Sequence, residues 1–528
     1  MRLSERPPLL YSSFGFVPVL ATSVSFLVLI FVGKFFSSPW LTFSYQDEGK
    51  TGLNDHNSLT NLPPFEAFHK PNLLASLRSG NDLEKTRPVS SLSETLPENE
   101  ENELQTTNPI TSMPSFEENT TVYNRTEGLV LNSSSAGGVR IRLDSKELSL
   151  VQARTNIKEA AKVRNLTSVH QDPDYVPFGP IYRNPNAFHR SFLEMEKLFK
   201  IYVYQEGEPP LFHDGPCKSI YSSEGRFVHQ LEKGKLFTTR NPDEAHVYFL
   251  PFSVVRMVHY LFVPGHYKIK AVGRVVGDYI DVISKKYPFW NESGGADHVM
   301  LSCHDWGPLS SSFVPELFHN SIRVFCNANK SEGFKPAKDA TLPEINLKTG
   351  EVTMLKGLSP SKRDILGFFV GGLHGRIREQ LLTAWENKDE ELQVYRKLPD
   401  RLSYESMLRR SRFCLCPSGY EVASPRIVEA IYAECVPVLI SESYVPPFSD
   451  VLNWKSFSVQ VEVKDIPKIK DILMAISPSQ YIRMQRRVKT VQRHFVLNGS
   501  PKRYDVFHMI VHSIWLRRLN IRKLSKLY

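Results

Sequence analysis

Short apolar runs alternate with helical stretches over the last two thirds of the chain. The runs have the length of buried strands, and the stretches between them have the spacing of apolar positions that is typical of helices. We predict strands at 200–204, 246–252, 298–302, 365–370, 412–417 and 436–440. We predict helices at about 254–262, 272–286, 375–387, 403–410 and 425–434.

This alternation indicates parallel sheets that are covered on both faces. It predicts an α/β fold with two Rossmann-like domains, 171–358 and 359–480, which face a cleft where ligands are expected to bind. The segment 481–528 predicts C-terminal helices that pack back on this body.

The N-terminal segment has a different pattern, because residues 14–32 form a run of nineteen residues without a charge. At about 1.5 Å per residue such a helix crosses a hydrocarbon core of roughly 30 Å. We interpret it as an uncleaved signal anchor, with a cleaved signal peptide as the alternative. Arg2 and Arg6 precede the run and Lys34 follows it, so the tail 1–13 is expected in the cytosol and the body in a lumen.

The segment after the anchor is polar and has no sustained helix or strand period. Residues 33–144 are rich in Ser, Thr, Asn, Glu and Pro, which indicates a flexible lumenal stem. Residues 145–170 then predict an amphipathic stem helix, and we expect the globular body to begin near Tyr175.

The net charge of +9 is distributed unevenly along the chain. Residues 1–40 carry +2, residues 41–140 hold 14 acidic and 7 basic side chains, and +14 remains on 141–528. A basic body is explained by a solvated surface, by attraction for acidic glycans such as pectins, or by nucleic acid. The expected lumenal location excludes nucleic acid as a partner.

The cysteines and the acceptor motifs for N-glycosylation lie on the C-terminal side of the anchor, which agrees with a lumenal body. An even number of cysteines permits up to three disulfides, with buried free thiols as the alternative for Cys414, Cys416 and Cys435. Their spacing does not form a zinc site. The remaining cysteines are Cys217, Cys303 and Cys326, and the Asn-x-Ser/Thr motifs begin at Asn119, Asn124, Asn132, Asn165, Asn291, Asn329 and Asn498.

The segment PSGYEVASPRIVEAIYAECVPVLI, residues 417–440, leaves a strand and enters a helix. Ser424 is the predicted N-cap and Pro425 the first helical residue, so free backbone N–H groups would face a phosphate beyond the strand. Arg426 adds a forked cation suited to a diphosphate, and Glu429 would accept hydrogen bonds from a ribose. The alternative is a capped core helix with a solvated Arg–Glu pair.

Two carboxylates and a second glycine-containing loop extend this region. Glu421 lies in the loop before the helix, so that Glu421 and Glu429 are both able to face one sugar nucleotide. The segment ILGFFVGGLHGRIREQLL runs from a buried strand through Gly371 to a helix with Arg378. It is a second phosphate candidate, with a plain tight turn as the alternative.

Polar side chains also surround the strand predicted at 298–302. His304 and Asp305 follow this strand, where open α/β sheets bind ligands, and either is a candidate base for an acceptor hydroxyl. Asp297 and His298 precede or begin the strand. The alternative is that these residues are structural, and no set of them has the spacing of a metal site.

In this order, the blocks resemble the plant exostosin-like proteins of glycosyltransferase family 47 over about residues 145–525. The resemblance rests on KIYVYQEGEPPLFHDGP, IYSSEGRF, DEAHVYFLPFS, KYPFWNESGGADHVMLSCHDWGP, GFKPAKDATLPE, CPSGYEVASPRIVEAIYAECVPVLI and DVFHMIVHSIWLRRLNIRK. It implies a type II Golgi membrane protein with a GT-B fold, whose N-terminal domain holds the acceptor and whose C-terminal domain holds the nucleotide sugar.

The resemblance further implies transfer of a sugar, usually from UDP, to a wall polysaccharide or proteoglycan glycan, with inversion and without a bound metal or other cofactor. The donor residues that it implies are Gly371, Arg378, Ser424, Arg426 and Glu429. The spacing of Glu421 and Glu429 also resembles that of retaining GT-B enzymes, so the stereochemistry stays open. A non-catalytic, glycan-binding or anchoring partner in a Golgi complex of glycosyltransferases is the alternative function.

The chain departs from the family pattern at Glu434, where the family has glycine. Glycine eases the left-handed exit of a helix, so the turn after the predicted helix 425–434 is placed in question.

Overall fold

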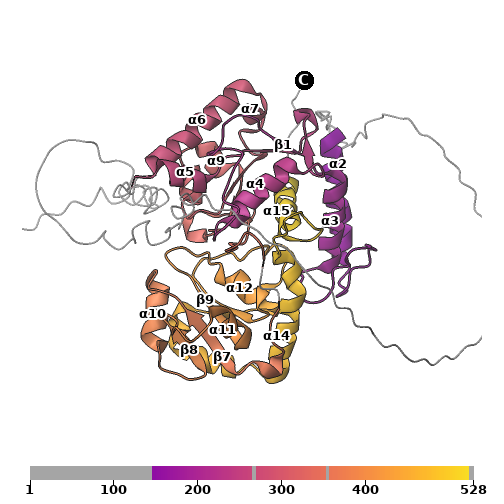
Figure 1. The fold of residues 1–528 in the computed structure, drawn as a ribbon. Coiled ribbons are helices and arrows are strands. Elements are labelled where there is room, and N and C mark those ends of the chain that lie inside the picture. The colour runs from indigo at the N-terminus through magenta and orange to yellow at the C-terminus, as the bar shows by residue number, and fades with distance from the viewer. Residues whose placement is uncertain (1–144, 264–268, 353–355, 522–528) are drawn as a thin grey trace, which may run out of the picture. The chain divides into compact units, whose positions relative to one another are not determined.

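The computed structural model describes residues 145–263, 269–352 and 356–521, which belong to one compact unit of the chain (Figure 1). The predicted tail 1–13, anchor 14–32 and stem 33–144 lie outside these residues, as do Asn119, Asn124 and Asn132. Among the helices of the described residues, none is sufficiently long and apolar to cross a membrane.

The first sheet is formed by the N-terminal half of the described chain. Its strands are all paired in parallel, in the order β2-β1-β3-β4-β5-β6. The bounds are β1 Ile201–Val203, β2 Thr238–Thr239, β3 Val247–Phe249, β4 His298–Ser302, β5 Ile322–Phe325 and β6 Ala340–Thr341. Strands β1, β3, β4 and β5 are buried along their whole length, as expected of a parallel sheet with both faces covered.

The second sheet is formed by the C-terminal half and is likewise parallel, in the order β11-β10-β9-β7-β8. Its strands are β7 Ile365–Val370, β8 Leu392–Tyr395, β9 Ser411–Pro417, β10 Val436–Ile440 and β11 Val459–Val461. The prediction of two parallel-sheet α/β domains is therefore confirmed.

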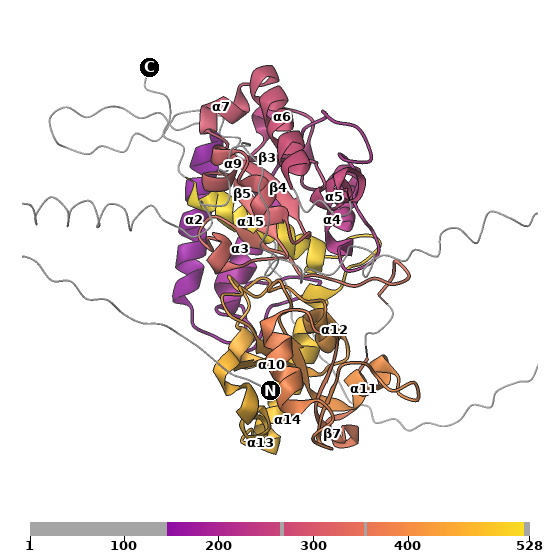
Figure 2. The ribbon, with the colours of Figure 1, turned by 90° about the vertical axis from the view of Figure 1, so that its left-hand side faces the viewer.

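Helices cover the two sheets (Figures 1 and 2). The α-helices are α2 Ser145–Lys162, α3 Pro185–Leu198, α4 Ser222–Lys233, α5 Val254–Leu261, α6 Lys270–Lys286, α7 Phe289–Ser293, α8 Gly307–Ser311, α9 Pro315–His319, α10 Arg376–Trp385, α11 Tyr404–Arg410, α12 Arg426–Tyr432, α13 Ile469–Met474, α14 Pro478–Val491 and α15 Val506–Asn520. Short 3-10 helices are η3 Pro242–Glu244, η4 Lys330–Glu332, η5 Pro360–Lys362, η6 Trp454–Ser456, η7 Val463–Lys468 and η8 Gln492–Phe495.

Strand β5 was not anticipated, because a charged residue interrupts its apolar pattern. Arg323 lies in β5 with no exposed surface and donates hydrogen bonds to both carboxylate oxygens of Asp339, over 3.0 and 2.6 Å. A bidentate pair of this kind satisfies a buried guanidinium, which is why the strand tolerates it.

The folded body begins at Ser145 rather than near Tyr175. Helix α2 packs against α3, and its Leu150 and Ala153 belong to the hydrophobic core. Its Glu147 forms a buried ion pair with Arg518 of α15. The segment predicted as a stem helix is thus part of the body, because an apolar side of the helix needs a partner surface.

Helix α15 follows the second sheet in sequence but packs against β5, β6 and α3 of the first-sheet domain (Figures 1 and 2). It is buried on nearly every side, including Met509 and Trp515. Helix α14 packs instead against α12 and β10. The C-terminal helices therefore pack back on the body, and the chain crosses from the second domain to the first before it ends.

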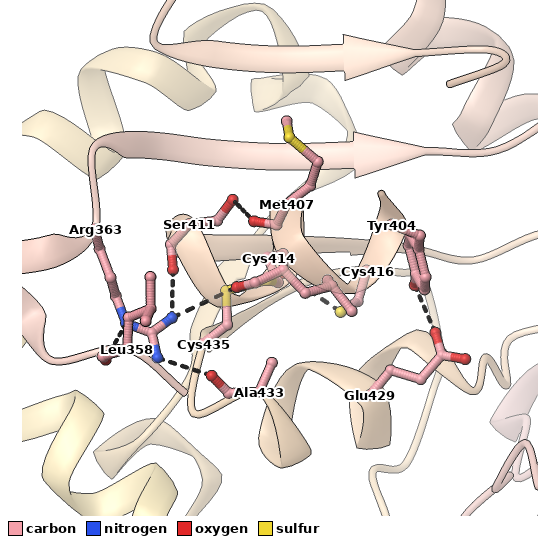
Figure 3. The surroundings of a disulfide bond; sticks show 11 residues. Leu358, Arg363, Tyr404, Met407, Ser411, Cys414, Cys416, Glu429, Ala433 and Cys435 are labelled. Atoms are coloured by element: carbon pink, nitrogen blue, oxygen red, sulfur yellow. Dashed lines mark hydrogen bonds between the residues drawn. A yellow bond between two sulfur atoms is a disulfide. The ribbon is translucent and has the colours of Figure 1, made fainter. Parts of the chain in front are cut away.

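Glu434 occupies the left-handed conformation that the family pattern assigns to glycine, with φ of 53°. Its carboxylate accepts a hydrogen bond from Gln485 of α14 over 3.0 Å. Arg363 donates to the carbonyl of the preceding residue, Ala433, over 2.8 Å and to that of Ser411 over 2.7 Å (Figure 3). These bonds hold the turn in place although a non-glycine residue is strained there.

Two disulfides form, Cys303–Cys326 and Cys414–Cys435. The first joins the segments that follow β4 and β5, and the second joins β9 to the segment before β10 (Figure 3). The alternative of buried free thiols is therefore wrong for Cys414 and Cys435. Cys217, partly exposed, and Cys416, buried, are free thiols.

Candidate active site

The candidate site is built from segments at the carboxyl ends of strands in both sheets. In the second sheet these are Gly371 after β7 and the loop 418–425 after β9. In the first sheet they are Asp305 after β4, Asn327 after β5 and Glu344 after β6. Carboxyl ends of neighbouring parallel strands lie at one edge of a sheet, where ligands bind in open α/β folds.

Arg426, the first residue of α12, reaches back to the end of β7. Its Nη2 donates a hydrogen bond to the carbonyl of Val370 over 3.1 Å, and its guanidinium lies 5.4 Å from the centre of the Phe369 ring. A Cβ atom on Gly371 would lie only 2.7 Å from the same Nη2. Gly371 is therefore needed because the guanidinium occupies the space of a side chain.

Arg378, in the first turn of α10, provides a second guanidinium beside Arg426. It is 8% exposed, and its Nε has no hydrogen-bond partner in the part of the chain that the structure describes. Burial, followed by the charge of Arg426, lowers the pKa of Arg378 to about 10. Two neighbouring cations repel each other, so this arrangement is suited to an anion with two negative groups.

The start of α12 differs from the prediction. The helix begins at Arg426, its cap is Pro425, and Ser424 makes no capping hydrogen bond. The Ser424 hydroxyl instead accepts a long hydrogen bond, 3.5 Å, from Nη1 of Arg426. Ser424 is thus not the N-cap, and the arginine side chains, rather than this short helix, provide the positive charge of the site.

Glu429 projects from α12 toward a tyrosine and an asparagine. Its Oε2 accepts a hydrogen bond from the Tyr404 hydroxyl over 2.5 Å (Figure 3), and its Oε1 accepts one from Nδ2 of Asn346 over 3.3 Å. Asn346 belongs to the first-sheet domain and Tyr404 to α11. The Glu429 carboxylate is therefore held in place by groups from both domains.

Glu421 has a separate set of partners. Its Oε2 accepts a hydrogen bond from Nδ2 of Asn327 over 2.6 Å, and its carboxyl group hydrogen-bonds that of Glu332. Burial, followed by the charges of Glu332 and Asp305, raises the pKa of Glu421 to about 9. Glu421 and Glu332 thus share a proton across the two domains, whereas Glu429 points to other groups.

His304 is held in one tautomer. Its Nδ1 accepts a hydrogen bond from the backbone N–H of Trp306 over 3.0 Å. Burial lowers the pKa of His304 to about 3, so the ring is neutral and carries its proton on Nε2. His304 can therefore donate a hydrogen bond to a ligand, but this geometry does not suit a base.

Asp305 is a more suitable candidate base than His304. Burial, followed by the negative charge of Glu332, raises the pKa of Asp305 to about 6. Asp297 and His298, at the other end of β4, have no exposed surface, and they contact each other over 3.1 Å. Those two residues belong to the core rather than to the site.

Glu344 is a site residue that the sequence patterns did not single out. It is 8% exposed, and burial raises its pKa well above the ordinary range. Asp305 adds to this rise in pKa, while Arg426 and Arg378 oppose it. The signal in the sequence is the alternation in LPEINL, where apolar Ile345 and Leu347 enter the core and leave Glu344 on the other side.

A cavity of about 460 Å³ has a lining that does not include Asp305, Glu344, Arg378 or Arg426. Its lining includes Lys330, Thr341, Tyr444 and Trp454. Burial raises the pKa of the Tyr444 hydroxyl, and the nearby Glu344 carboxyl adds to this rise. Within the described ranges, no group of three or more His, Cys, Asp or Glu side chains has the arrangement of a metal site.

The chain matches the family described as Exostosin GT47 domain over residues 195–476, which include Asp305, Glu344, Arg378 and Arg426. The match covers more than half of the chain, so the protein belongs to this family and is a glycosyltransferase.

Relatives from Arabidopsis thaliana agree with this assignment. The chain is 60% identical over 381 residues to "Probable glycosyltransferase At5g03795", with coverage of 72% of this chain and 73% of that protein. It is 56% identical over 409 residues to "Probable glycosyltransferase At3g07620", with coverage of 76% and 87%. "Probable beta-1,4-xylosyltransferase IRX10" is 26% identical over 342 residues, with coverage of 60% and 81%.

Proposed function

We propose that this glycosyltransferase moves a sugar from a UDP-sugar to a hydroxyl group of a cell-wall polysaccharide or a proteoglycan glycan. The observation that carries the proposal is the pair of guanidinium groups of Arg378 and Arg426 at the edge of the second sheet. Among the described residues neither forms an ion pair with a carboxylate, and Arg378 is nearly buried. Such a pair is complementary to a diphosphate.

The donor binds with its diphosphate between these arginines. Their fixed positive charge stabilises the leaving UDP, which is the role that a metal ion has in other transferases. Glu429, held by Tyr404 and Asn346, accepts hydrogen bonds from the ribose. An acceptor hydroxyl then displaces UDP in line, with inversion at the anomeric carbon.

The acceptor lies against the first-sheet domain. Carboxyl groups of Asp305, Glu332 and Glu421 accept hydrogen bonds from sugar hydroxyls, and the partly buried Tyr221 and Trp306 offer ring faces. Two distant relatives are named for xylan chemistry, as a "Probable glucuronoxylan glucuronosyltransferase" and a "Probable beta-1,4-xylosyltransferase". These names support a plant cell-wall polysaccharide as the acceptor.

The protein works in the Golgi lumen as a type II membrane protein anchored through residues 14–32. Two disulfides next to the site support an oxidising compartment. Asn165 and Asn291 are exposed and available for glycosylation, and Asn498 is partly exposed. Asn329 is 8% exposed and donates a hydrogen bond to Glu332 over 2.7 Å, so we expect it to remain unmodified.

The test is release of UDP by the full chain from a panel of UDP-sugars, with and without cell-wall oligosaccharides. Acceptor-dependent release from one donor is the expected result. UDP binding without release from any donor would contradict the proposal and favour a non-catalytic partner in a Golgi complex of glycosyltransferases.

A further inference from the structure

We propose that Glu344 is the catalytic base, which removes the proton from the acceptor hydroxyl as that oxygen attacks the sugar. The inference rests on the proposed transfer from a nucleotide diphosphate. It assigns to Glu344 the role for which His304 and Asp305 are the candidates in the sequence.

The backbone around Glu344 is fixed by the start of helix α4. The hydroxyl of Ser223 donates to the carbonyl of Pro343 over 2.5 Å, and that of Ser222 donates to the carbonyl of Ile345 over 2.6 Å. Neither serine has exposed surface. The peptide groups on both sides of Glu344 are therefore anchored, as a catalytic side chain requires.

The alternation of side chains along the extended segment around Glu344 directs the Glu344 side chain toward the second-sheet domain. Ile345 and Leu347 are buried in the core of the first, and the side chain of Asn346 reaches Glu429 of α12. Ser219 and Tyr221 bridge to Leu347 and Ile345, so this segment is extended. In an extended chain alternate residues share a face, which places Glu344 and Asn346 on the side of the donor site.

Charged groups of both proposed substrate sites act on Glu344. Arg378 and Arg426, which hold the proposed diphosphate, and Asp305 on the acceptor side all lie near enough for their charges to affect its carboxyl. The hydroxyls of Tyr221 and Tyr444 also lie within reach of its charge. Glu344 is thus near the leaving group and near the acceptor side at once.

The Glu344 carboxyl accepts no hydrogen bond from the described residues, although the residue is only 8% exposed. Its oxygens are not among the buried side-chain atoms that lack a partner, so they keep contact with solvent and are accessible to an acceptor hydroxyl. By contrast, Nδ1 of His304 is occupied by the N–H of Trp306. Neither arginine is among the charges that act on Asp305, which faces Glu332 instead.

The proton transfer accompanies the transfer of the sugar. The Glu344 carboxylate takes the hydroxyl proton, the acceptor oxygen forms a bond to the anomeric carbon, and the bond from that carbon to the diphosphate oxygen breaks. The electron pair leaves with UDP, whose charge the two guanidinium groups stabilise. Burial raises the pKa of Glu344, and the charges of Arg426 and Arg378 lower it against this effect, which favours the carboxylate form that accepts the proton.

The test compares Glu344→Gln with Glu344→Asp and with Asp305→Asn. We expect Glu344→Gln to lower kcat by about 10²–10⁴-fold, the usual contribution of a general base, and to remove the acid limb of the kcat–pH profile. Glu344→Asp should recover part of kcat with a shifted profile. Asp305→Asn should raise the acceptor KM more than it lowers kcat.

UDP binding separates catalysis from folding. Glutamine has the shape of the Glu344 carboxyl and does not contact the diphosphate, so Glu344→Gln should bind UDP as well as the unmodified chain does, whereas a structural defect would weaken binding. Retention of normal kcat and pH profile by Glu344→Gln, or loss of kcat by Asp305→Asn alone, would overturn the assignment of the base. Absence of UDP binding by the unmodified chain would instead contradict the proposed function.

Discussion

The guanidinium of Arg426 fills the space that a side chain in place of Gly371 would need, since a Cβ atom on Gly371 would lie 2.7 Å from Nη2 of Arg426. We predict that Gly371→Ala displaces the guanidinium and weakens donor binding. The end of an arginine side chain moves easily, so the melting temperature should change little. The measurements are the KM for the UDP-sugar, expected to rise about tenfold or more, and thermal unfolding.

Gly372→Ala is the matched control, because its Cβ would meet only His374, at an ordinary 3.4 Å. Its donor KM should stay close to that of the unmodified chain. Equal defects in both variants would mean that displacement of Arg426 is not the cause.

The hydrogen bond from Tyr404 to Glu429 makes a second prediction. Tyr404→Phe removes the 2.5 Å bond that orients this carboxylate. A hydrogen bond to a charged group contributes about 1.5–3 kcal/mol, so kcat/KM for the donor should fall about tenfold or more. Tyr395→Phe, which removes a 3.2 Å bond to Gln393 on β8, should leave kcat/KM unchanged. A Tyr404→Phe enzyme with normal donor kinetics would show that Glu429 does not contact the donor.

The carboxyl pair Glu332–Glu421 predicts a dependence of stability on pH. Folding raises the pKa of Glu421 from 4.5 to about 9, so between these values the folded chain binds more protons than the unfolded one. The contribution of Glu421 to stability is then fully present below about pH 4.5 and is lost as the pH rises toward 9. Glu421→Gln cannot ionise and should therefore show a smaller fall in melting temperature from pH 5 to pH 9. A fall equal to that of the unmodified chain would argue against the shared proton.

The cysteine arrangement is tested by alkylation and mass spectrometry. Cys217 is partly exposed, whereas Cys416 is buried and its pKa is raised to about 12 by burial, which leaves the thiol unreactive. We expect one label on the folded chain, two in denaturant and all six after reduction. Labelling of Cys414 or Cys435 in denaturant without reductant would be inconsistent with the disulfide.

The sequence predicts the sheets well wherever their strands are continuous apolar runs. Strands β4, β7 and β10 have the predicted bounds, because short buried runs leave little choice of ends. Strand β5 was missed because Arg323 interrupts its apolar pattern. The residue that neutralises this charge, Asp339, lies sixteen residues away and is not part of the local pattern. Two-residue strands such as β6 carry too little pattern to be predicted from local sequence.

The site was predicted only in part, for a similar reason. Arg378 and Arg426 stand at the starts of helices that follow apolar strands, which local patterns reveal. The capping role of Ser424 was wrong, because the helix begins at Arg426, one residue later than predicted, and its cap is Pro425. Glu344 ends the block GFKPAKDATLPE, which supports the family resemblance but has no pattern of a catalytic site. Its importance depends on arginines from another domain, which only tertiary structure brings near it.

The central claim is that Arg378 and Arg426 hold the diphosphate of the donor. The most direct measurement is calorimetric binding of UDP to the full chain and to Arg378→Ala, with Arg376→Ala as the matched control, since Arg376 is exposed and paired with Glu442. We predict binding by the unmodified chain and by Arg376→Ala, and a loss of at least tenfold in affinity for Arg378→Ala. Equal UDP affinity in all three would contradict the assignment.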